Sequence, residues 1–478
     1  MGHKNPFYIT TTLPYVNADP HIGFALEIVN ADAIARYQRL MGREVFFNTG
    51  SDEHGQKIFQ KAQEEGKDVQ EYVDYYAGRF SKLKNALGLS NDAFIRTTDP
   101  RHTEAAQEIW KRCLEAGDIY KKKYKGLYCV GDEAFIKESD LVNGRCPNHP
   151  NMDPIEIEEE NYFFKLSAYQ DKLLEYLKHN DNVLPLWRRD EAIQFVEGGL
   201  EDFSVSREKA RMSWGIPVPG DASQVMYVWF DALTNYISTL GWPNDTEGNF
   251  KKFWEDGFTV QVAGKDQVRF QSVMWQAMLM SAKLPTTKEV VYHGFITSGG
   301  QKMSKSLGNV IEPFSLVDEY GTDAVRYFLS RHVHPFEDSD FTLERFKDAY
   351  NADLANGLGN LVARIMKLAE DNLEQGTRPE FAGFPQEYTD ALEAFETNKT
   401  LEFVWERIKL LDQQITDTEP FKVIKSNPEE GKELIAALAQ ELYGIAVLLE
   451  PFMPATSKAI KDAVTENKKP ANLFLRKD

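Results

Sequence analysis

The alternation of short apolar strands with amphipathic helices constrains the fold of this chain most. "FYITTT" has the β-branched and aromatic composition of a buried strand, and "REVFFNTGSDEHG" supplies a second one. Residues 21–42 between them carry apolar side chains at helical spacing, with Asp19 as the expected cap, Pro20 at the first position and Gly42 at the end. Strand, helix, strand is the unit of a parallel sheet, which binds ligands at the carboxyl ends of its strands.

The same alternation returns after residue 210, in "VMYVWFDALTNYISTLG", "FTVQVAGKDQVRFQSVMWQAMLMSA" and "KEVVYHGFITSGG". A turn-rich, charged stretch that begins near residue 120 separates the two parts. The pattern predicts an α/β fold, a split Rossmann-type doubly wound parallel sheet with a connective insertion, followed by an all-α helical bundle. We expect these boundaries: 1–117 and 211–295 for the two halves of the Rossmann domain, 118–210 for the insertion, 296–349 for a connecting segment and 350–478 for the bundle.

Composition narrows the class of protein. The 478 residues are 42% hydrophobic, which is typical of a well-packed protein of several domains, and the net charge of -19 offers no bulk attraction to nucleic acid or to an anionic membrane. Three cysteines are too few for a disulfide framework, and the N-terminal segment has no apolar run of a signal sequence. The apolar stretch 433–455 carries three glutamates and is typical of a core helix. We therefore expect a cytoplasmic protein.

Two separate segments have features of a phosphate site. "GGQKMSKSLGN" places Lys302 and Lys305 close together between glycines, which suits either a solvated surface loop or a mobile clamp for a polyanion. His21 lies in the first turn of a predicted helix, where unpaired N–H groups and the helix dipole favour phosphate, although a lone histidine there is more often structural. Gly23 lets a flat ring approach the backbone. Together these residues predict a nucleotide clamp.

"PHIGF" and "KMSKS" resemble the two signature motifs of class I aminoacyl-tRNA synthetases, in the expected order. Within that class the chain is similar to the methionyl-tRNA synthetase family over nearly its whole length, through "TLPYVN", "GSDEHG", "DFSVSR", "WGIPVPG", "VWFDAL", "GKD", "HGFITSGGQKMSKSLGNVI" and "YGTDAVRYFL". The resemblance implies ATP-dependent activation of methionine to methionyl-adenylate and transfer to the 3' end of tRNA(Met), including initiator tRNA. It also implies that 296–349 is a stem-contact segment and 350–478 an anticodon-binding domain.

The resemblance also implies roles for individual residues. His21, Lys302 and Lys305 are expected to stabilise charge on the triphosphate together with Mg²⁺, and the expected ATP contacts are Gly23, Gly264, Asp266 and Lys305. Asp266, taken alone, would be read as a helix cap. An aromatic-walled slot suits a thioether, although such aromatic residues can also be plain core. The expected methionine pocket consists of Leu13, Tyr15, Asp52 for the α-ammonium, Trp229, Tyr236, Phe270, Gln271 and Trp275.

Four positions depart from the family pattern. Phe24 replaces the second histidine of the first signature, and Leu233, Gln267 and Gln271 differ from the residues usual near the pocket. These departures are also compatible with two alternatives: another class I synthetase for an apolar amino acid, or a weakly active paralogue that binds tRNA or nucleotide. The short insertion has little room for the editing domain that branched amino acids usually need.

The insertion contains a possible zinc motif. Cys129, Asp132, Cys146 and His149 have the spacing C-x2-D-x13-C-x2-H, which resembles the single zinc knuckle of some family members with Asp132 in place of a cysteine. A zinc site and a degenerate knuckle that folds without metal both fit this pattern. Cys113 lies on an amphipathic run and is expected to be a small core residue.

The helical tail carries the residues expected to read the anticodon. Asn360 and Arg364 match the family's N-x3-R and lie one helical turn apart, so both can face one base. Phe421 in "EPF" stands where the family has a stacking tryptophan; a buried Phe421 is the alternative. The chain ends at Asp478 without the appended module of many bacterial relatives, so we expect a monomer.

Overall fold

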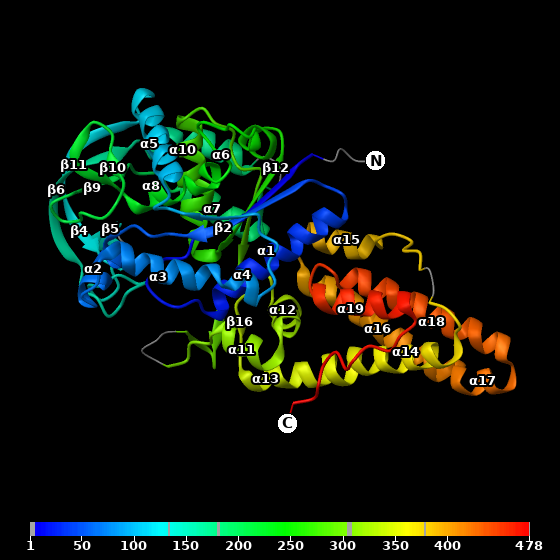
Figure 1. Ribbon diagram of the computed structural model, residues 1–478. Coiled ribbons are helices and arrows are strands. Elements are labelled where there is room, and N and C mark those ends of the chain that lie inside the picture. Colours follow the sequence, from blue (N-terminus) through cyan, green and yellow to red (C-terminus); the bar gives the residue numbers. More distant parts are fainter. Residues whose placement is uncertain (1–4, 132–133, 179–181, 304–307, 377–378, 478) are drawn as a thin grey trace. The chain divides into compact units, whose positions relative to one another are not determined.

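The computed structural model describes residues 5–131, 134–178, 182–303, 308–376 and 379–477 (Figure 1). The chain forms two compact units, and each is described by itself. The first unit contains residues 1–20, 42–84 and 91–293. The second contains residues 21–41, 85–90 and 294–478.

A six-stranded parallel sheet forms the centre of the first unit, in the order β3-β2-β1-β12-β13-β7. Its middle strand β1 is wholly buried, as its β-branched and aromatic sequence predicts. The strand order runs outward from β1 in both directions, so the predicted doubly wound α/β fold is confirmed. The strands are β1 (Phe7–Thr11), β2 (Val45–Ser51), β3 (Ala93–Arg96), β7 (Val183–Leu184), β12 (Phe258–Gly264) and β13 (Glu289–His293).

The short strand β7 comes from the range 118–210. It pairs in parallel with Val290 and Val291 of β13. The helices on either side of it, α6 (Gln170–Lys178) and α7 (Leu186–Glu197), bury side chains in the same core as Tyr8 and Trp110. This part of the chain therefore packs onto the central sheet.

The remainder of that range contains two long antiparallel strands, β4 (Ile119–Cys129) and β6 (Ile155–Phe164). Lys125 lies opposite Glu158 and its Nζ is 2.8 Å from an oxygen of Glu156. The sequence predicted a turn-rich, charged insertion here without naming strands, and these cross-strand charge pairs are the signal that indicates strands. These strands form the sheet β5-β4-β6-β8 with β5 (Ala134–Ile136) and β8 (Phe203–Ser204). A second small sheet, β10-β11-β9, joins β9 (Ser206–Glu208) of this range to two strands that follow it, β10 (Pro217–Val218) and β11 (Asp221–Met226).

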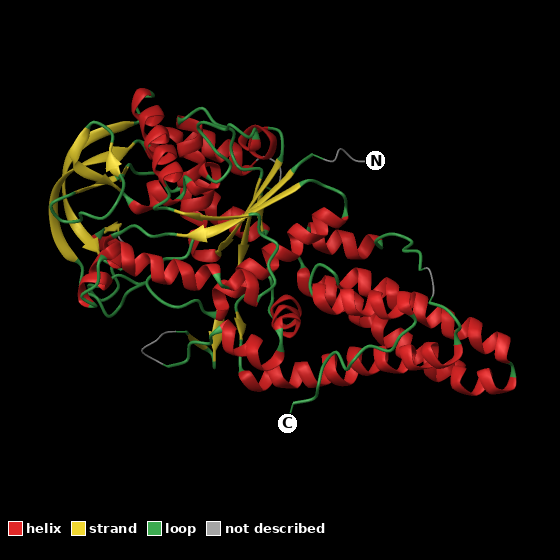
Figure 2. Cartoon of the chain, viewed as in Figure 1, coloured by secondary structure: helices red, strands yellow, loops and turns green. Residues whose placement is uncertain are grey.

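Helices flank the sheet of the first unit (Figure 2). Trp110, Trp254 and Trp275 are fully buried, and Cys113 is a core residue as predicted. The helices are α2 (Gln56–Glu64), α3 (Val69–Ser81), α4 (Leu83–Ala86, at the boundary of the units), α5 (Pro100–Glu115), α8 (Val228–Ala232), α9 (Asn235–Ser238) and α10 (Trp275–Ser281), with short 3₁₀ or π turns η1 (Glu138–Asp140), η2 (Leu166–Tyr169), η3 (Phe250–Glu255), η4 (Lys265–Gln267) and η5 (Phe270–Met274).

The second unit is mainly helical, and its described residues from 350 onward form the helices that the sequence predicted (Figure 2). A small sheet, β15-β14-β16, follows α1 in the sequence, and α11 and α12 lie between its strands β15 and β16. The π-helix η7 joins α13 to α14, and a left-handed Glu419 (φ 42°) separates α16 from α17. The elements are β14 (Ile296–Ser298), β15 (Gln301–Lys302), β16 (Ser339–Asp340), α1 (Ile22–Leu40), α11 (Pro313–Tyr320), α12 (Thr322–Arg331), α13 (Leu343–Ala349), η7 (Tyr350–Gly359), α14 (Asn360–Asn372), α15 (Gln386–Glu393), α16 (Thr397–Thr418), α17 (Pro420–Ser426), α18 (Pro428–Leu449) and α19 (Pro454–Glu466).

The predicted start of helix α1 is wrong. Its N-cap is His21, whose ring accepts a hydrogen bond from the Gly23 N–H, and not Asp19. The carboxylate of Asp19 instead accepts a hydrogen bond from Arg79 Nε at 2.8 Å. Gly42, in the left-handed region at φ 76°, follows the end of the helix as predicted.

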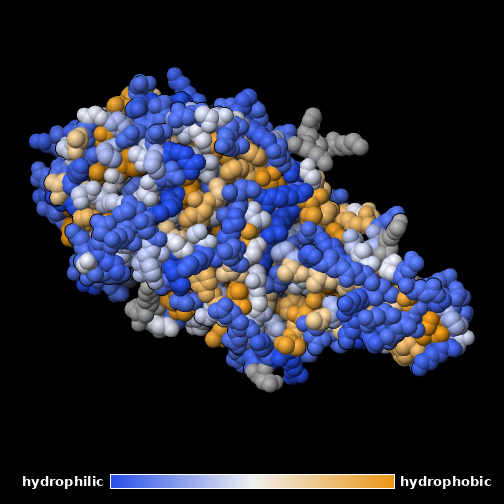
Figure 3. Space-filling model, in the orientation of Figure 1, coloured by the Kyte–Doolittle hydropathy of each residue, from blue (hydrophilic) through white to orange (hydrophobic). Residues whose placement is uncertain are grey.

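The surface view is largely hydrophilic, with scattered apolar residues (Figure 3). Within the described ranges, no helix combines the length and the apolar character that a membrane crossing requires. The apolar stretch in α18 buries its side chains in the second unit, so its interpretation as a core helix is correct.

Candidate active site

Three neighbouring strands of the first unit end at one edge of the sheet. Leu13 and Tyr15 follow β1, Asp52 follows β2 and Asp266 follows β12. The backbone N–H of Asp52 donates to the Pro14 carbonyl at 3.0 Å, and Asp52 and Tyr15 form a parallel bridge. Because the carboxyl ends of parallel strands share an edge, predicted residues for the amino acid and for ATP occur together here.

An aromatic stack lies beside this edge. Trp229 of α8 stacks on Phe270 of η5, with ring centroids 3.9 Å apart. Tyr15 contacts the edge of Trp229, with centroids 6.3 Å apart. All three side chains, like that of Leu13, are partly exposed, so this stack is accessible and not plain core.

A second, buried group contains Tyr236, Gln271 and Trp275, each at most 2% exposed. Gln271 Nε2 donates to the Tyr236 hydroxyl at 2.5 Å, as expected for an amide at this position. The rings of Tyr236 and Trp275 meet edge to face at 5.8 Å. Gln271 Oε1 and Trp275 Nε1 are buried without a hydrogen-bond partner among the described residues. Such groups favour a ligand that offers polar atoms.

Asp266 lies in η4, directly after Gly264, and its side chain is exposed. It accepts a hydrogen bond from Gln267 Nε2 at 3.2 Å. The cap residue of η4 is Gly264, and no side chain caps this turn. The alternative of Asp266 as a helix cap therefore finds no support, and its carboxylate is accessible to a ligand.

The second unit carries the first signature motif at the start of α1. His21 Nδ1 accepts the Gly23 N–H at 3.1 Å, so in the neutral ring the proton is on Nε2. Desolvation lowers the pKa of His21, which favours this neutral form, although the residue remains exposed. A Cβ on Gly23 would lie 2.9 Å from the ring atoms of His21. Gly23 is therefore needed for the position of the ring.

The segment with the second signature motif contacts this helix within the same unit. The Ile22 N–H donates to the Ile311 carbonyl at 2.9 Å, and Met303 Cε lies 3.8 Å from the Cβ position of Gly23. Lys302 ends β15, where its backbone pairs with Thr297, and Lys305 lies outside the described residues. The described part of the second signature segment thus lies beside the first signature segment.

Two glycines at the tip of β14 and β15 have left-handed backbones. Gly299 and Gly300 have φ values of 62° and 73°, which other residues rarely adopt. The Gly300 N–H and the Thr297 hydroxyl each donate to Asp340 Oδ1 at 2.8 Å. The hydrogen bond from the Gly300 N–H is the main cause of the lowered pKa of Asp340. Asp340 therefore anchors the base of the lysine-bearing segment.

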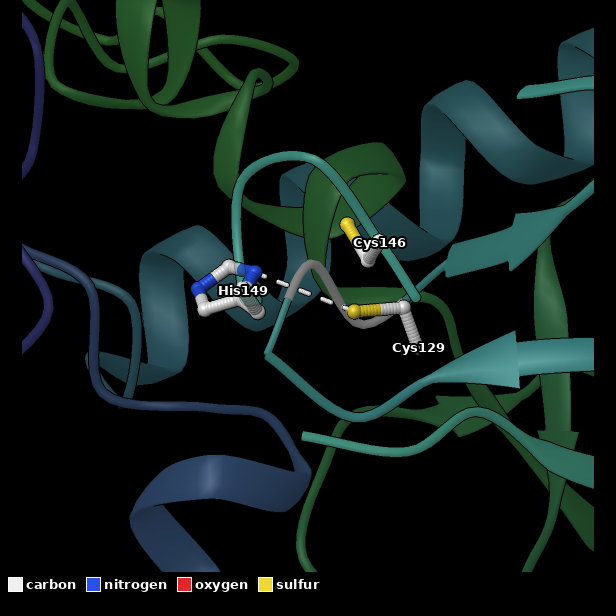
Figure 4. A group of neighbouring side chains, drawn as sticks. All are labelled: Cys129, Cys146 and His149. Carbon is white, nitrogen blue, oxygen red and sulfur yellow. Dashed lines mark hydrogen bonds between the residues drawn. The ribbon is translucent and has the colours of Figure 1, made fainter. Parts of the chain in front are cut away.

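Three of the predicted metal ligands lie together in the first unit (Figure 4). The ligand atoms of Cys129, Cys146 and His149 are within 4.8 Å of one another, and Cys129 Sγ is 3.7 Å from His149 Nδ1. Two ligands about 2.0–2.3 Å from a tetrahedral zinc ion would be separated by roughly this distance. Asp132 lies outside the described residues. The two thiols and the imidazole fit zinc.

The predicted anticodon residues lie on the helices of the second unit. Asn360 is exposed at the start of α14, and Arg364 Nη1 is 2.5 Å from Asp412 Oδ1 of α16. Phe421 of α17 is 42% exposed, which excludes the alternative that it is buried. An exposed phenylalanine offers a face on which a base can stack.

A family model described as "tRNA synthetases class I (M)" matches residues 7–156 and 150–366. The chain belongs to this class I tRNA synthetase family. The matched ranges include both signature segments and all the residues predicted for the amino-acid pocket.

Relatives of this class I tRNA synthetase match over almost the whole chain. The methionine-tRNA ligase of Rhizobium meliloti (strain 1021) is 43% identical over 482 residues, which cover 97% of this chain and 92% of that relative. The ligase of Thermotoga maritima is 41% identical, covering 98% and 77%. A solved structure of Mycobacterium tuberculosis methionyl-tRNA synthetase in complex with methionyl-adenylate has a TM-score of 0.90 at 35% identity, covering 99% and 100%. The resemblance read from the motifs is confirmed.

Sequence reasoning missed some buried polar residues of this class I tRNA synthetase. His54 and Asp231 lie inside the motifs "GSDEHG" and "VWFDAL", but only Asp52 and Trp229 of those motifs were given roles. The two side chains form a hydrogen bond of 2.7 Å. The position of both residues inside these motifs is the signal that could have identified them from the sequence.

Proposed function

We propose that the chain is a methionine:tRNA ligase, which activates methionine with ATP and transfers it to the 3' end of tRNA(Met), including initiator tRNA. The observation that carries the proposal is the position of Asp52 beside Tyr15 at the carboxyl edge of the sheet, with Trp229 and Phe270 stacked next to them. A carboxylate beside aromatic rings suits an amino acid with a positive α-ammonium and an unbranched thioether side chain. The high identity to methionine-tRNA ligases supports the same substrate.

The reaction has two steps. A carboxylate oxygen of methionine attacks the α-phosphorus of ATP, the bond from that phosphorus to the bridging oxygen breaks, and pyrophosphate leaves. A hydroxyl of the terminal adenosine of tRNA then attacks the acyl carbon, and AMP leaves. Such transfers depend mainly on positioning and on stabilisation of charge.

We assign the ATP site to residues of both signature segments and of β12. His21, with Nε2–H as donor, Lys302 and Lys305 would stabilise the developing charge on the triphosphate. Asp266 would accept hydrogen bonds from ribose hydroxyls, and Gly23 and Gly264 would allow close approach of the nucleotide. Mg²⁺ would arrive bound to ATP and would neutralise part of the charge on its phosphates.

We assign the amino acid to the first unit. Asp52 would bind the α-ammonium, and the stacked rings would close on the apolar side chain. Gln271 fixes the hydroxyl of Tyr236, which supports a polar contact to the thioether sulfur. The full proposed pocket is Leu13, Tyr15, Asp52, Trp229, Tyr236, Phe270, Gln271 and Trp275.

Exchange of labelled pyrophosphate into ATP, measured with each of the twenty standard amino acids in turn, tests this function. We expect exchange with methionine alone. Exchange with another apolar amino acid instead would still support a class I synthetase but would contradict the assignment of the pocket to methionine. No exchange with any amino acid would favour a paralogue that only binds tRNA or nucleotide.

Gly23→Ala is expected to slow methionine-dependent exchange by at least about tenfold, because the new Cβ would lie 2.9 Å from the His21 ring and displace it. Thermal stability should change little, since the higher helix propensity of alanine offsets the loss of the cap from the displaced His21 ring. Gly78→Ala in α3 is the matched control, because nothing lies within 4 Å of its Cβ position. Equal rates for Gly23→Ala and Gly78→Ala would contradict the role of the ring position.

We further propose that Cys129, Cys146 and His149 bind one zinc ion, with Asp132 as the fourth ligand. Metal analysis of protein purified without chelator should give about one equivalent of zinc, and Cys146→Ser should remove most of it. Cys113→Ala is the control, because this buried cysteine lies in the core and not among the three ligands. Zinc well below one equivalent in the unmodified protein would reject the site.

We propose that Asn360, Arg364 and Phe421 contact the anticodon. Phe421→Ala should raise the KM for tRNA(Met) by about tenfold, the expected loss of one stacked base, and should leave pyrophosphate exchange unchanged. Leu410→Ala is the control, because Leu410 is 68% exposed on α16 and offers no aromatic face. An equal loss in charging and in exchange would instead indicate a folding defect in Phe421→Ala.

The finer organisation is part of the same proposal. We assign 1–117 and 211–295 to the catalytic domain, 118–210 to the insertion, 296–349 to the stem-contact segment and 350–478 to the anticodon-binding domain. A cytoplasmic monomer suits an enzyme of translation with these parts.

A further inference from the structure

Asp231 is a fully buried carboxylate between two histidines. Its Oδ2 is 2.7 Å from His54 Nδ1, and its Oδ1 is 2.7 Å from His102 Nε2. The other ring nitrogen of His102 lies 2.9 Å from the Ser238 hydroxyl. A carboxylate only accepts hydrogen bonds, so each histidine must carry its proton on the nitrogen that faces Asp231. The contacts therefore fix which ring nitrogen of each histidine carries the proton that faces Asp231.

These contacts join the segments that carry the proposed methionine pocket. His54 lies two residues after Asp52, and its N–H is 3.4 Å from Asp52 Oδ1. Asp231 lies two residues after Trp229 on α8, and Ser238 two residues after Tyr236 on α9. A shift in the Asp231 contacts would thus move the α-ammonium ligand relative to the aromatic wall.

The turn that contains His54 is also held at Glu53. Both carboxylate oxygens of Glu53 bind Arg96, at 2.6 and 2.8 Å, and the Trp214 ring N–H donates to the Glu53 carbonyl at 2.6 Å. The Glu53 contacts reach β3 and the segment before β10, whereas His54 alone among these side chains reaches α8. The His54 ring also packs against the Trp214 ring, with centroids 5.6 Å apart, so the two sets of contacts meet at Trp214. Asp231→Asn changes none of these side chains and therefore tests the Asp231 contacts separately.

Burial alone would raise the pKa of Asp231, but the interactions with His54 and His102 outweigh it, and the pKa is lowered. The carboxylate is therefore charged at neutral pH and binds both donors strongly. Apolar residues often replace a buried ionic group without loss of stability, so stability by itself does not account for this arrangement.

We infer that Asp231 is a positioning residue for the amino acid, and that it acts through His54 to set the distance between Asp52 and the aromatic side chains of α8 and α9. This inference rests on the proposed function. Asp231 and His54 are not assigned any contact with the substrate. Their effect should appear in the affinity for the amino acid and not in that for ATP.

The test uses two substitutions of one residue. His54→Leu removes the donor to Asp231, whereas the amide nitrogen of His54→Asn can occupy the place of Nδ1 and donate. We expect His54→Leu and Asp231→Asn to raise the KM for methionine in pyrophosphate exchange by about tenfold or more, with the KM for ATP changed less than about twofold. His54→Asn should restore the KM for methionine to within about threefold of the unmodified chain.

Asp202→Asn is the matched control, because its carboxylate accepts hydrogen bonds from Tyr120 and from Ser167, and neither partner lies on a segment that carries a pocket residue. Melting curves identify any variant that fails to fold, and His54→Asn keeps the test valid if His54→Leu does not fold. The inference is overturned if folded His54→Leu retains the KM for methionine, if His54→Asn restores nothing, or if the two KM values rise equally. If the unmodified chain shows no pyrophosphate exchange with any amino acid as substrate, the proposed function is overturned as well.

Discussion

Replacing His21 with alanine is expected to slow methionine-dependent exchange of pyrophosphate into ATP by about 100- to 1,000-fold, the usual cost of one donor that stabilises developing charge. His21 lies at the N-terminus of α1, where backbone N–H groups already favour phosphate. Its Nδ1 is occupied by the Gly23 N–H, so the neutral ring offers its proton from Nε2. Pre-steady-state measurement of adenylate formation isolates this step from tRNA charging.

Two further substitutions separate the two nitrogens of His21. His21→Asn retains an oxygen that can cap α1 but has no donor at the position of Nε2, whereas His21→Gln places an amide nitrogen near that position. We expect His21→Asn to keep the thermal stability and lose the rate, and His21→Gln to recover part of the rate. A slow reaction in His21→Gln together with a fast one in His21→Asn would show that capping is the function of His21.

The pH dependence follows from the direction of the pKa shift. Desolvation lowers the pKa of His21, so the neutral donor form predominates at neutral and alkaline pH. The rate ratio of the unmodified chain to His21→Ala should therefore be constant above pH 7. It should change only on acidification through the lowered pKa, where the ring becomes charged. A ratio that already changes between pH 7 and pH 8.5 would contradict a neutral donor.

Most of the central sheet was predictable because its longer strands have a local sequence pattern. β1, β2, β12 and β13 are apolar runs followed by polar turns, so composition alone places them. β7 has only two residues, Val183 and Leu184. It is a strand because it pairs with β13, which lies more than a hundred residues later in the sequence. Pairing of this kind leaves no local pattern in the sequence.

The prediction of the start of α1 was wrong for a similar reason. Asp19 is a good cap by type, but Arg79 lies sixty residues away in the sequence and binds its carboxylate. His21 then caps the helix with its own ring. Residue preferences describe an isolated helix, whereas the choice between two adjacent caps depends on tertiary partners.

For the candidate site, the motifs predicted which residues occur together but not how each is held. Tyr15, Trp229 and Phe270 were expected to share a pocket, and they contact one another. Neither the hydrogen bonds of Asp231 nor the ion pair of Arg364 with Asp412 could be derived, because they join helices whose relative position is a tertiary property. Asp412 lies in no motif that would have indicated its pairing with Arg364.

Replacing Arg326 with methionine is expected to lower the free energy of unfolding of the second unit by roughly 3–5 kcal/mol, the usual cost of breaking a buried ion pair. Arg326 of α12 and Asp32 of α1 are both 0% exposed, and Nη2 lies 2.8 Å from Oδ2. The guanidinium also donates to the carbonyls of Phe452, Pro451 and Leu87, at 2.7, 2.8 and 3.2 Å. Methionine fills a similar volume but donates no hydrogen bond to these three carbonyls, and Asp32 keeps its pairing with Arg36 but loses that with Arg326.

Urea unfolding, monitored separately for each transition of the chain, measures the effect of Arg326→Met. Lys458→Met is the control, because Lys458 pairs with Asp462 on an exposed face of α19, and we expect little change in its unfolding free energy. A similar small change for Arg326→Met would contradict a structural role of the buried pair.

The pair also predicts how stability depends on pH. Burial alone would raise the pKa of Asp32, but Arg326 and Arg36 outweigh it and the pKa is lowered. The contribution of the carboxylate is therefore fully present above its ordinary pKa and is lost as pH falls through the lowered value. The stability difference between the unmodified chain and Arg326→Met should be constant from pH 6 to pH 8 and should shrink in acid. Because Asp32 belongs to the helix that begins at His21, the Arg326 variant should also lose pyrophosphate exchange at urea concentrations that leave the unmodified chain active.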